Sequence, residues 1–288
     1  MKGIILAGGA GSRLYPLSLV ASKQLQPVYD KPMIYYPLTT LLEAGIREIA
    51  LISTPHDLPR FRHLLGSGAH LGVSFTYIEQ ARPEGIAQAF LLAADFVGTE
   101  SASLILGDNI FYGATGFSEK VRGFSGGATV FGYSVRDPER YGVIALDEAG
   151  KVVNIIEKPS TFVSPYAVPG FYVYDGEVVA RTQALKPSAR GELEITDLNK
   201  SYLHDGKLQV HLMPRGVAWL DAGTSSSLHE ASSFIQAIEK RQSIKIGCPE
   251  EAAYRQGFIS KDEFAALIKT LPNCEYRAYL ETALSIPF

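Results

Sequence analysis

Gly3-Ile4-Ile5-Leu6-Ala7-Gly8-Gly9-Ala10-Gly11-Ser12-Arg13-Leu14 opens the 288-residue sequence, after two residues, with an apolar run and a glycine-rich loop. The apolar run predicts a buried β-strand over residues 3–8. Three glycines in four positions allow the backbone to turn tightly and to bring its N–H groups against a ligand. Arg13 and, ten residues later, Lys23 add positive charge. An ordinary strand-to-loop turn is the alternative, but the two cations favour a loop that holds a polyphosphate.

This loop follows neither of two common nucleotide-binding patterns. A P-loop has four residues between its first glycine and a Gly-Lys-Ser/Thr triplet, which the segment lacks. A dinucleotide-binding fingerprint needs a third glycine three residues after Gly11, where the sequence has Leu14. The loop is therefore glycine-rich without being either kind, and it includes an arginine that those patterns do not use.

Composition restricts the class of protein. Hydrophobic residues make up 46% of the chain, enough for a packed core, and 27 basic against 30 acidic side chains leave a net charge of −3. This balance gives no support for binding nucleic acid or an acidic membrane surface. We expect no membrane span, no export signal and no disulfide or zinc framework from Cys248 and Cys274. The expectation is a globular protein of the reducing cytoplasm.

The first 135 residues alternate apolar runs with helical patterns. Strands are predicted over 3–8, 46–53, 73–80, 101–107 and 128–135, with helices near 33–44, 58–65 and 85–97. Such alternation predicts an α/β fold with a Rossmann-like, mainly parallel sheet covered by helices on both faces. Ligands of such sheets bind beyond the carboxyl ends of the strands, which is where the glycine loop lies.

From residue 142 the pattern changes. Strands over 142–147, 151–157, 168–174 and 207–213 are separated by short turns and predict antiparallel additions to the sheet. Helices are expected at 177–185, 195–204 and 225–242. The last 45 residues are predicted to be wholly helical, over 250–257, 261–270 and 274–284. We therefore divide the chain into residues 1–243 and a helical segment, 244–288, that serves for oligomer contacts, for regulation or simply as core cover.

Two aspartates come directly after apolar runs. Asp108 follows Ser103–Gly107 and Asp221 follows Val217–Leu220. An acidic group at the end of a buried strand is poorly explained by packing, and two of them could share one Mg²⁺ together with phosphate oxygens and water. The alternative is that each aspartate caps a following turn or helix.

Polar side chains end two further predicted strands. Lys158 could bind a phosphate as a point charge, and Glu157 could accept hydrogen bonds from sugar hydroxyls, although both could also simply face solvent. Gln80 carries an amide that both donates and accepts, which suits the edge of a pyrimidine base. Gly85 would leave room for that base to lie against the backbone.

Taken together, these segments resemble the sugar-1-phosphate nucleotidyltransferases, and among them the members that use dTTP. The matching segments run almost from end to end: 3–16, Ser22-Lys23-Gln24-Leu25, 29–38, 106–113, 137–143 and 186–197. The resemblance implies the fold described above and a Mg²⁺-dependent transfer of dTMP from dTTP to α-D-glucose 1-phosphate. Residues 1–135 would then bind the nucleotide and 136–243 the sugar phosphate.

The resemblance also implies a role for each matching position. The implied catalytic residues are Arg13, Lys23, Asp108, Lys158 and Asp221. The implied nucleotide-binding residues are Leu6, Gly8, Gly9, Gly11, Ser12, Arg13, Lys23, Gln24, Gln80, Gly85 and Asp108. Glucose 1-phosphate would be bound by Asn109, Tyr141, Gly142, Glu157, Lys158, Val168 and Arg190, and Mg²⁺ by Asp108 and Asp221.

Further properties of the family are expected here: a homotetramer, a place at the start of dTDP-L-rhamnose or related deoxysugar synthesis, and a regulatory site near residues 248–251 for dTDP-rhamnose or a thymidine nucleotide. Ala114 stands near that expected site, where some relatives have a polar residue. Two other classes of protein fit the sequence less well. The missing third glycine and Arg13 oppose an NAD-dependent oxidoreductase, and the retained aspartates and lysines oppose a non-catalytic nucleotide-sugar sensor.

Overall fold

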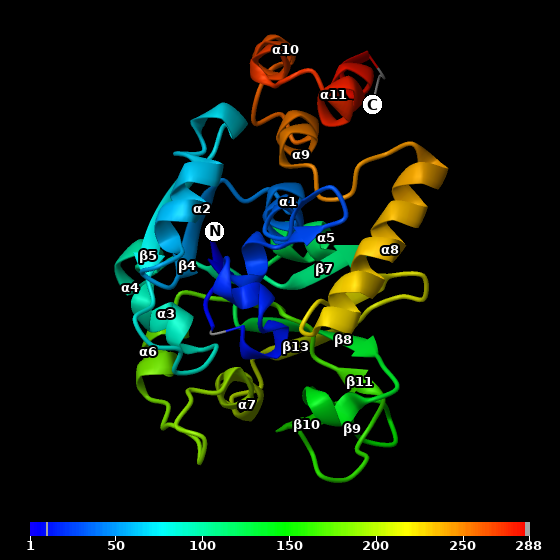
Figure 1. Ribbon diagram of the computed structural model, residues 1–288. Helices are drawn as coiled ribbons and strands as arrows, with labels where there is room; N and C mark the ends of the chain where they lie inside the picture. The colour runs from blue at the N-terminus through cyan, green and yellow to red at the C-terminus, as the bar shows by residue number, and fades with distance from the viewer. Residues whose placement is uncertain (10, 286–288) are drawn as a thin grey trace.

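The computed structural model describes residues 1–9 and 11–285. A mixed sheet of ten strands forms the centre of this part of the chain, with helices on both faces (Figure 1). Its strands are β1 (Lys2–Leu6), β4 (Glu48–Ser53), β5 (Ser74–Glu79), β6 (Ala102–Leu106), β8 (Ala128–Ser134), β9 (Gly142–Leu146), β10 (Val152–Glu157), β11 (Tyr166–Ala167), β12 (Phe171–Tyr174) and β13 (Leu208–Leu212). Two small sheets pair β2 (Pro27–Val28) with β3 (Lys31–Pro32), and β7 (Asn109–Tyr112) with β14 (Ala218–Asp221).

The helices alternate with these strands in the first half of the chain and dominate its end. They are α1 (Tyr35–Glu43), α2 (Leu58–Leu65), α3 (Gln88–Leu92), α4 (Ala94–Val97), α5 (Phe117–Arg122), α6 (Val178–Gln183), α7 (Ile195–His204), α8 (Ser225–Gln242), α9 (Pro249–Arg255), α10 (Lys261–Thr270) and α11 (Glu275–Ser285).

The strand order is β10-β9-β11-β8-β12-β6-β1-β4-β5, and β13 also pairs with β8. β1 lies between β4 and β6, and all three are parallel, as is the β4–β5 pair. β12 is antiparallel to both of its neighbours, and β9, β10 and β11 form antiparallel pairs. The predicted α/β fold with a mainly parallel centre and antiparallel additions is therefore confirmed.

Neighbouring residues of the parallel strands point to opposite faces of the sheet, because side chains alternate along a strand. Ile5, Leu51 and Ile105 belong to one buried cluster, which includes residues of α1, α2, α9 and α10. Ile4, Ile52 and Leu104 belong to a second cluster with residues of α3, α6 and α7. Because both faces are covered, the exposed working edge of these strands is their carboxyl end, where the loops meet.

Three expectations need correction. The strand at 207–213 was expected as an antiparallel addition, but β13 pairs with β8 in parallel. β7 and α5 were not expected. The helix predicted over 85–97 is two short helices that begin only at Gln88 and break at Ala93. Its first residues bond elsewhere: Leu193 accepts from the N–H of Ala87 and donates to the carbonyl of Glu84.

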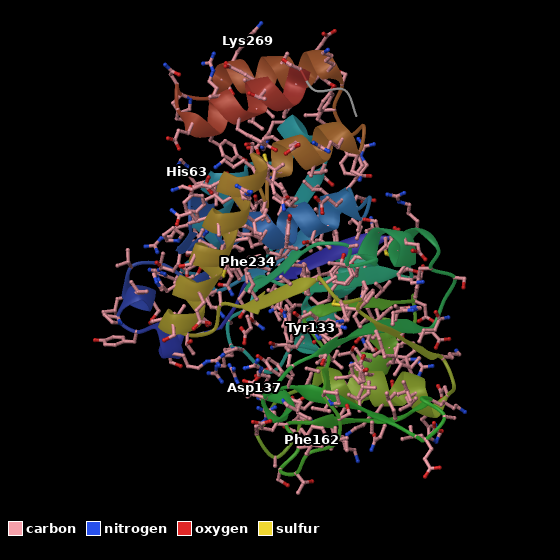
Figure 2. The ribbon with its side chains drawn as sticks, turned by 90° about the vertical axis from the view of Figure 1, so that its right-hand side faces the viewer. His63, Tyr133, Asp137, Phe162, Phe234 and Lys269 are labelled. Atoms are coloured by element: carbon pink, nitrogen blue, oxygen red, sulfur yellow. The ribbon has the colours of Figure 1, made fainter. Side chains whose placement is uncertain are left out.

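The three last helices were expected, and they lie at the opposite end of the molecule from β9 and β10 (Figure 1). Figure 2 shows the same separation, with Lys269 of α10 at one end and Phe162 at the other. Helix α9 packs on α1 and so joins this segment to the sheet domain. Cys248 is buried, Cys274 is exposed, and both are free. Among the described residues, no helix has the length and apolar character to cross a membrane.

Candidate active site

The glycine loop lies at the carboxyl end of β1. Gly9 and Gly11 have positive φ angles of 98° and 58°, a region that other L-residues rarely adopt, so the turn needs glycine at both positions. The chain then forms a short 3-10 turn over Ser12–Leu14, which carries Arg13 toward the other predicted site residues. The guanidinium of Arg13 lies beside Gly223. A Cβ added to Gly223 would be 3.3 Å from Nη2 of Arg13.

Lys23 is almost completely buried and lies between the two aspartates. Its Nζ is 2.5 Å from Oδ2 of Asp108 and 3.9 Å from Oδ1 of Asp221. Asp108 sits in the tight turn between β6 and β7, and Asp221 ends β14 directly opposite Asn109, the first residue of β7. The structure therefore brings together three charged residues that are far apart in the sequence.

Asp221 is subject to opposing influences in this cluster. Burial, and next the negative charge of Asp108, raises the pKa of Asp221 above the usual value of an aspartate, against the opposing effect of Lys23, Arg13 and Arg140. Arg140 contributes a guanidinium nitrogen 3.8 Å from Oδ2 of Asp221. Asp108 and Asp221 nevertheless bring two carboxylates to one place, and carboxylate oxygens are ligands of divalent cations.

The donor set fits Mg²⁺, which takes one or two carboxylates and completes its octahedron with phosphate oxygens and water. Asp108 and Asp221 both direct oxygens to the position that Lys23 Nζ now approaches. Within residues 1–9 and 11–285, no three histidine, cysteine or acidic side chains gather as a metal cluster. A magnesium ion here would therefore depend on its substrates for several ligands.

A cavity of about 300 Å³ opens beside this cluster. Nine predicted site residues line it: Arg13, Asp108, Asn109, Tyr141, Gly142, Glu157, Lys158, Val168 and Asp221. They come from the glycine loop, from the β6–β7 turn and the start of β7, from the adjacent ends of β9 and β10, from the residue after β11, and from β14. The volume suits a small ligand such as a sugar phosphate.

Glu157 and Lys158 lie side by side at one wall of the cavity. Oε2 of Glu157 accepts a hydrogen bond of 2.6 Å from Thr196, and its Oε1 is 3.9 Å from Nζ of Lys158. Lys158 has a positive φ of 42°, which is strained for a residue with a Cβ. Its N–H donates to the carbonyl of Tyr141 at 2.9 Å, and this bond helps to hold the strained turn. Arg190 is not among the residues that line the cavity, but it contacts two that do. Its Nη2 is 2.9 Å from both carboxylate oxygens of Glu194 and 3.6 Å from Oε1 of Glu157.

The residues predicted to recognise the base flank the start of the glycine loop instead of lining this cavity. Gln24 donates to the carbonyl of Gly8 at 3.3 Å. Gln80 follows β5 and is buried. Its Oε1 lies so close to Gly8 that a Cβ added to Gly8 would be only 1.9 Å from it. Leu6, the last residue of β1, completes this side of the loop.

Gly85 has a structural requirement of its own. Its φ is 103°, and an added Cβ would lie 2.3 Å from the carbonyl oxygen of Leu193. The close approach of the Leu193 backbone therefore already requires glycine here, and the expected contact of Gly85 with a base stays a prediction. The segment around Gly85 is fixed to the loop between α6 and α7.

Several cavity residues were missed by the sequence interpretation, and Trp219 is the most informative. Its Nε1 donates to Oδ1 of Asn109 at 2.7 Å, and its ring centre is 4.9 Å from that of Tyr141. Asn109 in turn donates to Oδ1 of Asp108 at 2.8 Å. Trp219 lies two residues before Asp221, which places both on one face of β14, so strand alternation could have identified it. The other missed residues include Ile86, Arg140, Tyr172, Glu194 and Thr196.

Comparisons with known proteins agree with this geometry. The family model of nucleotidyl transferases matches residues 2–238. A glucose-1-phosphate thymidylyltransferase of Mycolicibacterium smegmatis is 53% identical over 97% of this chain and 98% of its own length. One from Xanthomonas campestris pv. campestris is 54% identical over 99% of this chain and 97% of its own.

A solved structure supports the same assignment. A Bacillus anthracis protein described as a glucose-1-phosphate thymidylyltransferase, in complex with sucrose, superposes with a TM-score of 0.76 at 46% identity. The superposition covers 81% of this chain and 94% of that one. The chain is therefore a nucleotidyltransferase: it belongs to the nucleotidyl transferase family, together with these glucose-1-phosphate thymidylyltransferases.

Proposed function

We propose that the chain transfers dTMP from dTTP to α-D-glucose 1-phosphate in a Mg²⁺-dependent reaction that yields dTDP-glucose and pyrophosphate. One observation carries the proposal: Lys23, Asp108 and Asp221 meet between the glycine loop and the cavity lined by Glu157 and Lys158. The names of relatives at about 50% identity supply the identity of the two substrates.

The reaction joins two anions, so the first obstacle is repulsion. In the proposed step, a phosphate oxygen of glucose 1-phosphate attacks the α-phosphorus of dTTP in line. The bond from that phosphorus to the bridging oxygen breaks, and pyrophosphate leaves with the electron pair. Arg13, Lys23 and Lys158 offset the negative charge and orient the attacking oxygen. The protein needs no nucleophile, because the sugar phosphate is already ionised at neutral pH.

The remaining residues position the two substrates. Backbone N–H groups of the described part of the glycine loop face the triphosphate, and Gln24 and Gln80 bind thymidine. Glu157 accepts from sugar hydroxyls while Thr196 fixes its other oxygen. Asp108 and Asp221 would hold Mg²⁺, which would neutralise phosphate charge as a Lewis acid when bound.

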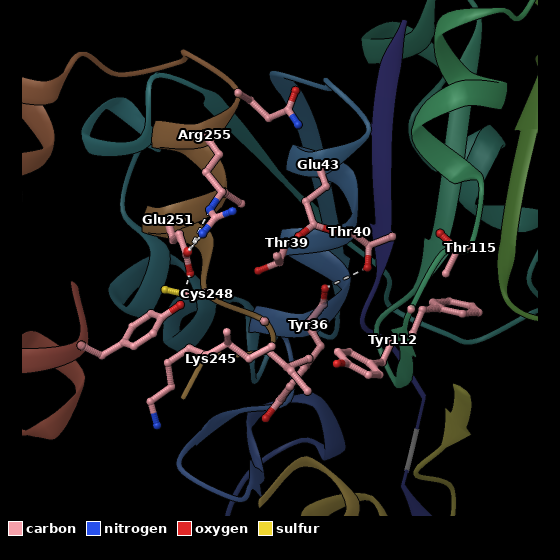
Figure 3. Close-up of a pocket in the computed structure, with 18 residues that line it drawn as sticks. Tyr36, Thr39, Thr40, Glu43, Tyr112, Thr115, Lys245, Cys248, Glu251 and Arg255 are labelled. Atoms are coloured by element: carbon pink, nitrogen blue, oxygen red, sulfur yellow. Dashed lines mark hydrogen bonds and ion pairs between the residues drawn. The ribbon is translucent and has the colours of Figure 1, made fainter. Parts of the chain in front are cut away.

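A second cavity of about 490 Å³ lies between α1, residues 244–248 and α9 (Figure 3). Lys245 and Arg255 bring positive charge to it, with Arg255 paired to Glu251 at 2.6 Å. β7 runs from Asn109 in the active-site cavity to Tyr112 in this one. We propose that this cavity is the regulatory site for dTDP-rhamnose or a thymidine nucleotide.

Three broader properties belong to the same proposal. The enzyme would supply dTDP-glucose to dTDP-L-rhamnose or related deoxysugar synthesis. It would act in the cytoplasm as a homotetramer. Residues 244–288 would be its regulatory and interface segment. The support for these properties is the family resemblance and the position of the second cavity against this segment.

The activity is tested by pyrophosphate release from glucose 1-phosphate with dTTP, UTP or ATP, each with and without Mg²⁺. We expect release with dTTP and Mg²⁺. UTP should be a weaker substrate by about 10- to 200-fold in kcat/KM, since one methyl group distinguishes the bases and is worth roughly 1–3 kcal/mol. Discrimination against ATP should be much larger. Absence of release under every condition would favour a non-catalytic nucleotide-sugar sensor.

Lys158→Ala should keep the fold and lower kcat/KM about 10²- to 10³-fold, because one cationic contact to the transition state is lost. Lys151→Ala is the matched control: it removes an exposed lysine beside the other end of β10 and should leave activity unchanged. Steady-state kinetics measure both. Near-normal kcat/KM in the Lys158 variant would remove that residue from the proposed mechanism.

Asp221→Asn should raise the Mg²⁺ concentration for half-maximal activity at least about tenfold, because one carboxylate ligand is lost. In the unsubstituted enzyme, protons compete with the metal for Asp221 as pH falls. Because the pKa of Asp221 is raised, the Mg²⁺ concentration needed for activity should begin to increase at a higher pH than it would with an ordinary aspartate. The control is Asp205→Asn at the end of α7. An unchanged metal titration would exclude Asp221 from the metal site.

Arg255→Ala should weaken binding of dTDP-rhamnose to the second cavity about 10- to 100-fold, because a charged hydrogen-bond donor to its phosphates is removed. Isothermal titration calorimetry should then detect two bound molecules per chain in the unsubstituted protein and one in the variant. Equal stoichiometry of one in both proteins would contradict a second site.

A further inference from the structure

The amide of Gln80 is held by a chain of hydrogen bonds that ends outside the active site. Nε2 of Gln80 donates to Oε1 of Gln88 at 2.7 Å, and Nε2 of Gln88 donates to Oε2 of Glu84 at 2.8 Å. We infer that Gln88 is a positioning residue that fixes the orientation of the Gln80 amide and makes the nucleotide site select bases with an N–H at position 3. The inference rests on the proposed function, in which Gln80 binds the base.

The outer end of the chain sets its direction. The Glu84 carboxylate can only accept hydrogen bonds, so the NH₂ group of Gln88 must face it. The backbone N–H of Glu84 can only donate, and it donates to Oε1 of Gln88 at 3.1 Å. The amide of Gln88 is therefore oriented by two groups of fixed polarity.

The orientation of Gln88 then determines that of Gln80. Oε1 of Gln88 accepts, so Gln80 must turn its NH₂ group toward it. The carbonyl oxygen of Gln80 is thereby directed the other way, against Gly8 at the start of the glycine loop. Both glutamines are buried, 3% and 9% exposed, so water cannot easily compensate a reversed amide.

The backbone that supports this chain is itself fixed. The carbonyl of Glu84 accepts from the N–H of Leu193 at 2.7 Å, and Ala87 donates to the carbonyl of Leu193 at 3.2 Å. Gly85, between them, lies so close to Leu193 that only glycine fits. Glu84 is exposed, but its backbone N–H, which anchors Gln88, is held in place.

A fixed carbonyl at Gln80 distinguishes pyrimidines by chemistry. Thymine and uracil carry a hydrogen-bond donor at N3, which that carbonyl can accept. Cytosine carries a lone pair at N3, so two acceptors would face each other in a buried site. A site built in this way rejects the mismatched base strongly, because the buried group is left unpaired. The same site distinguishes thymine from uracil only weakly, since they share this edge.

Gln88→Met tests the inference, because methionine keeps the length of the side chain but removes both hydrogen-bonding groups. The measurement is the ratio of kcat/KM for dTTP to that for dCTP, with glucose 1-phosphate and Mg²⁺. We expect kcat/KM for dTTP to fall about tenfold and the dTTP:dCTP ratio to fall at least about tenfold. The KM for glucose 1-phosphate should stay within about twofold. A folded variant that loses activity equally with both nucleotides would overturn the inference, since a purely structural role predicts equal losses.

A rescue variant separates orientation from packing. Gln88→Glu alone places a carboxylate against Glu84 and should lower activity with dTTP by repulsion. The double variant Gln88→Glu/Glu84→Gln exchanges donor and acceptor between the two positions, which removes the repulsion and keeps an acceptor oxygen facing Gln80. It should recover activity with dTTP and keep the dTTP:dCTP ratio within about threefold of the unsubstituted enzyme, unlike Gln88→Met. Glu84→Gln alone is the control and should change the ratio little, because its new carbonyl can still accept from Gln88. A double variant whose dTTP:dCTP ratio is as low as that of Gln88→Met would overturn the inference.

Failure of the proposed function is seen separately, as absence of dTTP turnover in the unsubstituted enzyme. In that case the same ratios are obtained from the binding of dTTP and dCTP by isothermal titration calorimetry. Equal affinity of the unsubstituted protein for dTTP and dCTP would overturn the inference whether or not turnover occurs.

Discussion

The ammonium group of Lys23, held between Asp108 and Asp221, is the interaction on which the site depends. These charges are largely removed from water, and a partly buried charge without a partner is costly. Lys23 is the direct ion-pair partner of Asp108, while Asp221 shares Lys23 with Arg13 and Arg140. Because the three residues come from three segments, their meeting also fixes how those segments lie: the turn after the glycine loop, the β6–β7 turn and the end of β14.

The sheet makes this meeting possible. β1 and β6 are parallel neighbours, so the glycine loop and Asp108 leave the sheet at the same edge. β7 then turns back and pairs with β14 in a register that places Asp221 opposite Asn109. Trp219 and Asn109 hold this register by a side-chain hydrogen bond. In the proposed mechanism the cluster is a resting arrangement, in which Lys23 neutralises carboxylates that later face a metal ion and phosphates.

Much of this was predictable from the sequence, and the failures have physical causes. The alternation of apolar strands and helices predicted the central sheet because both faces of parallel strands are buried. The residues at strand ends, such as Asp108 and Lys158, stood out because charge at such positions is poorly explained by packing. The parallel pairing of β13 was missed, since a short strand carries no sign of its partner. The late start of α3 was missed because bonds to Leu193, about a hundred residues away, override local helix propensity.

The central claim is that Asp108 and Asp221 form a metal site whose place Lys23 occupies until substrates bind. The most direct measurement is a crystal structure with Mg²⁺, glucose 1-phosphate and a dTTP analogue whose α,β-bridging oxygen is replaced by a methylene group. The account predicts a metal ion about 2.1 Å from an oxygen of each aspartate, with Lys23 moved onto a phosphate oxygen. A complex in which Lys23 still bridges the two aspartates and the metal contacts neither of them would contradict it.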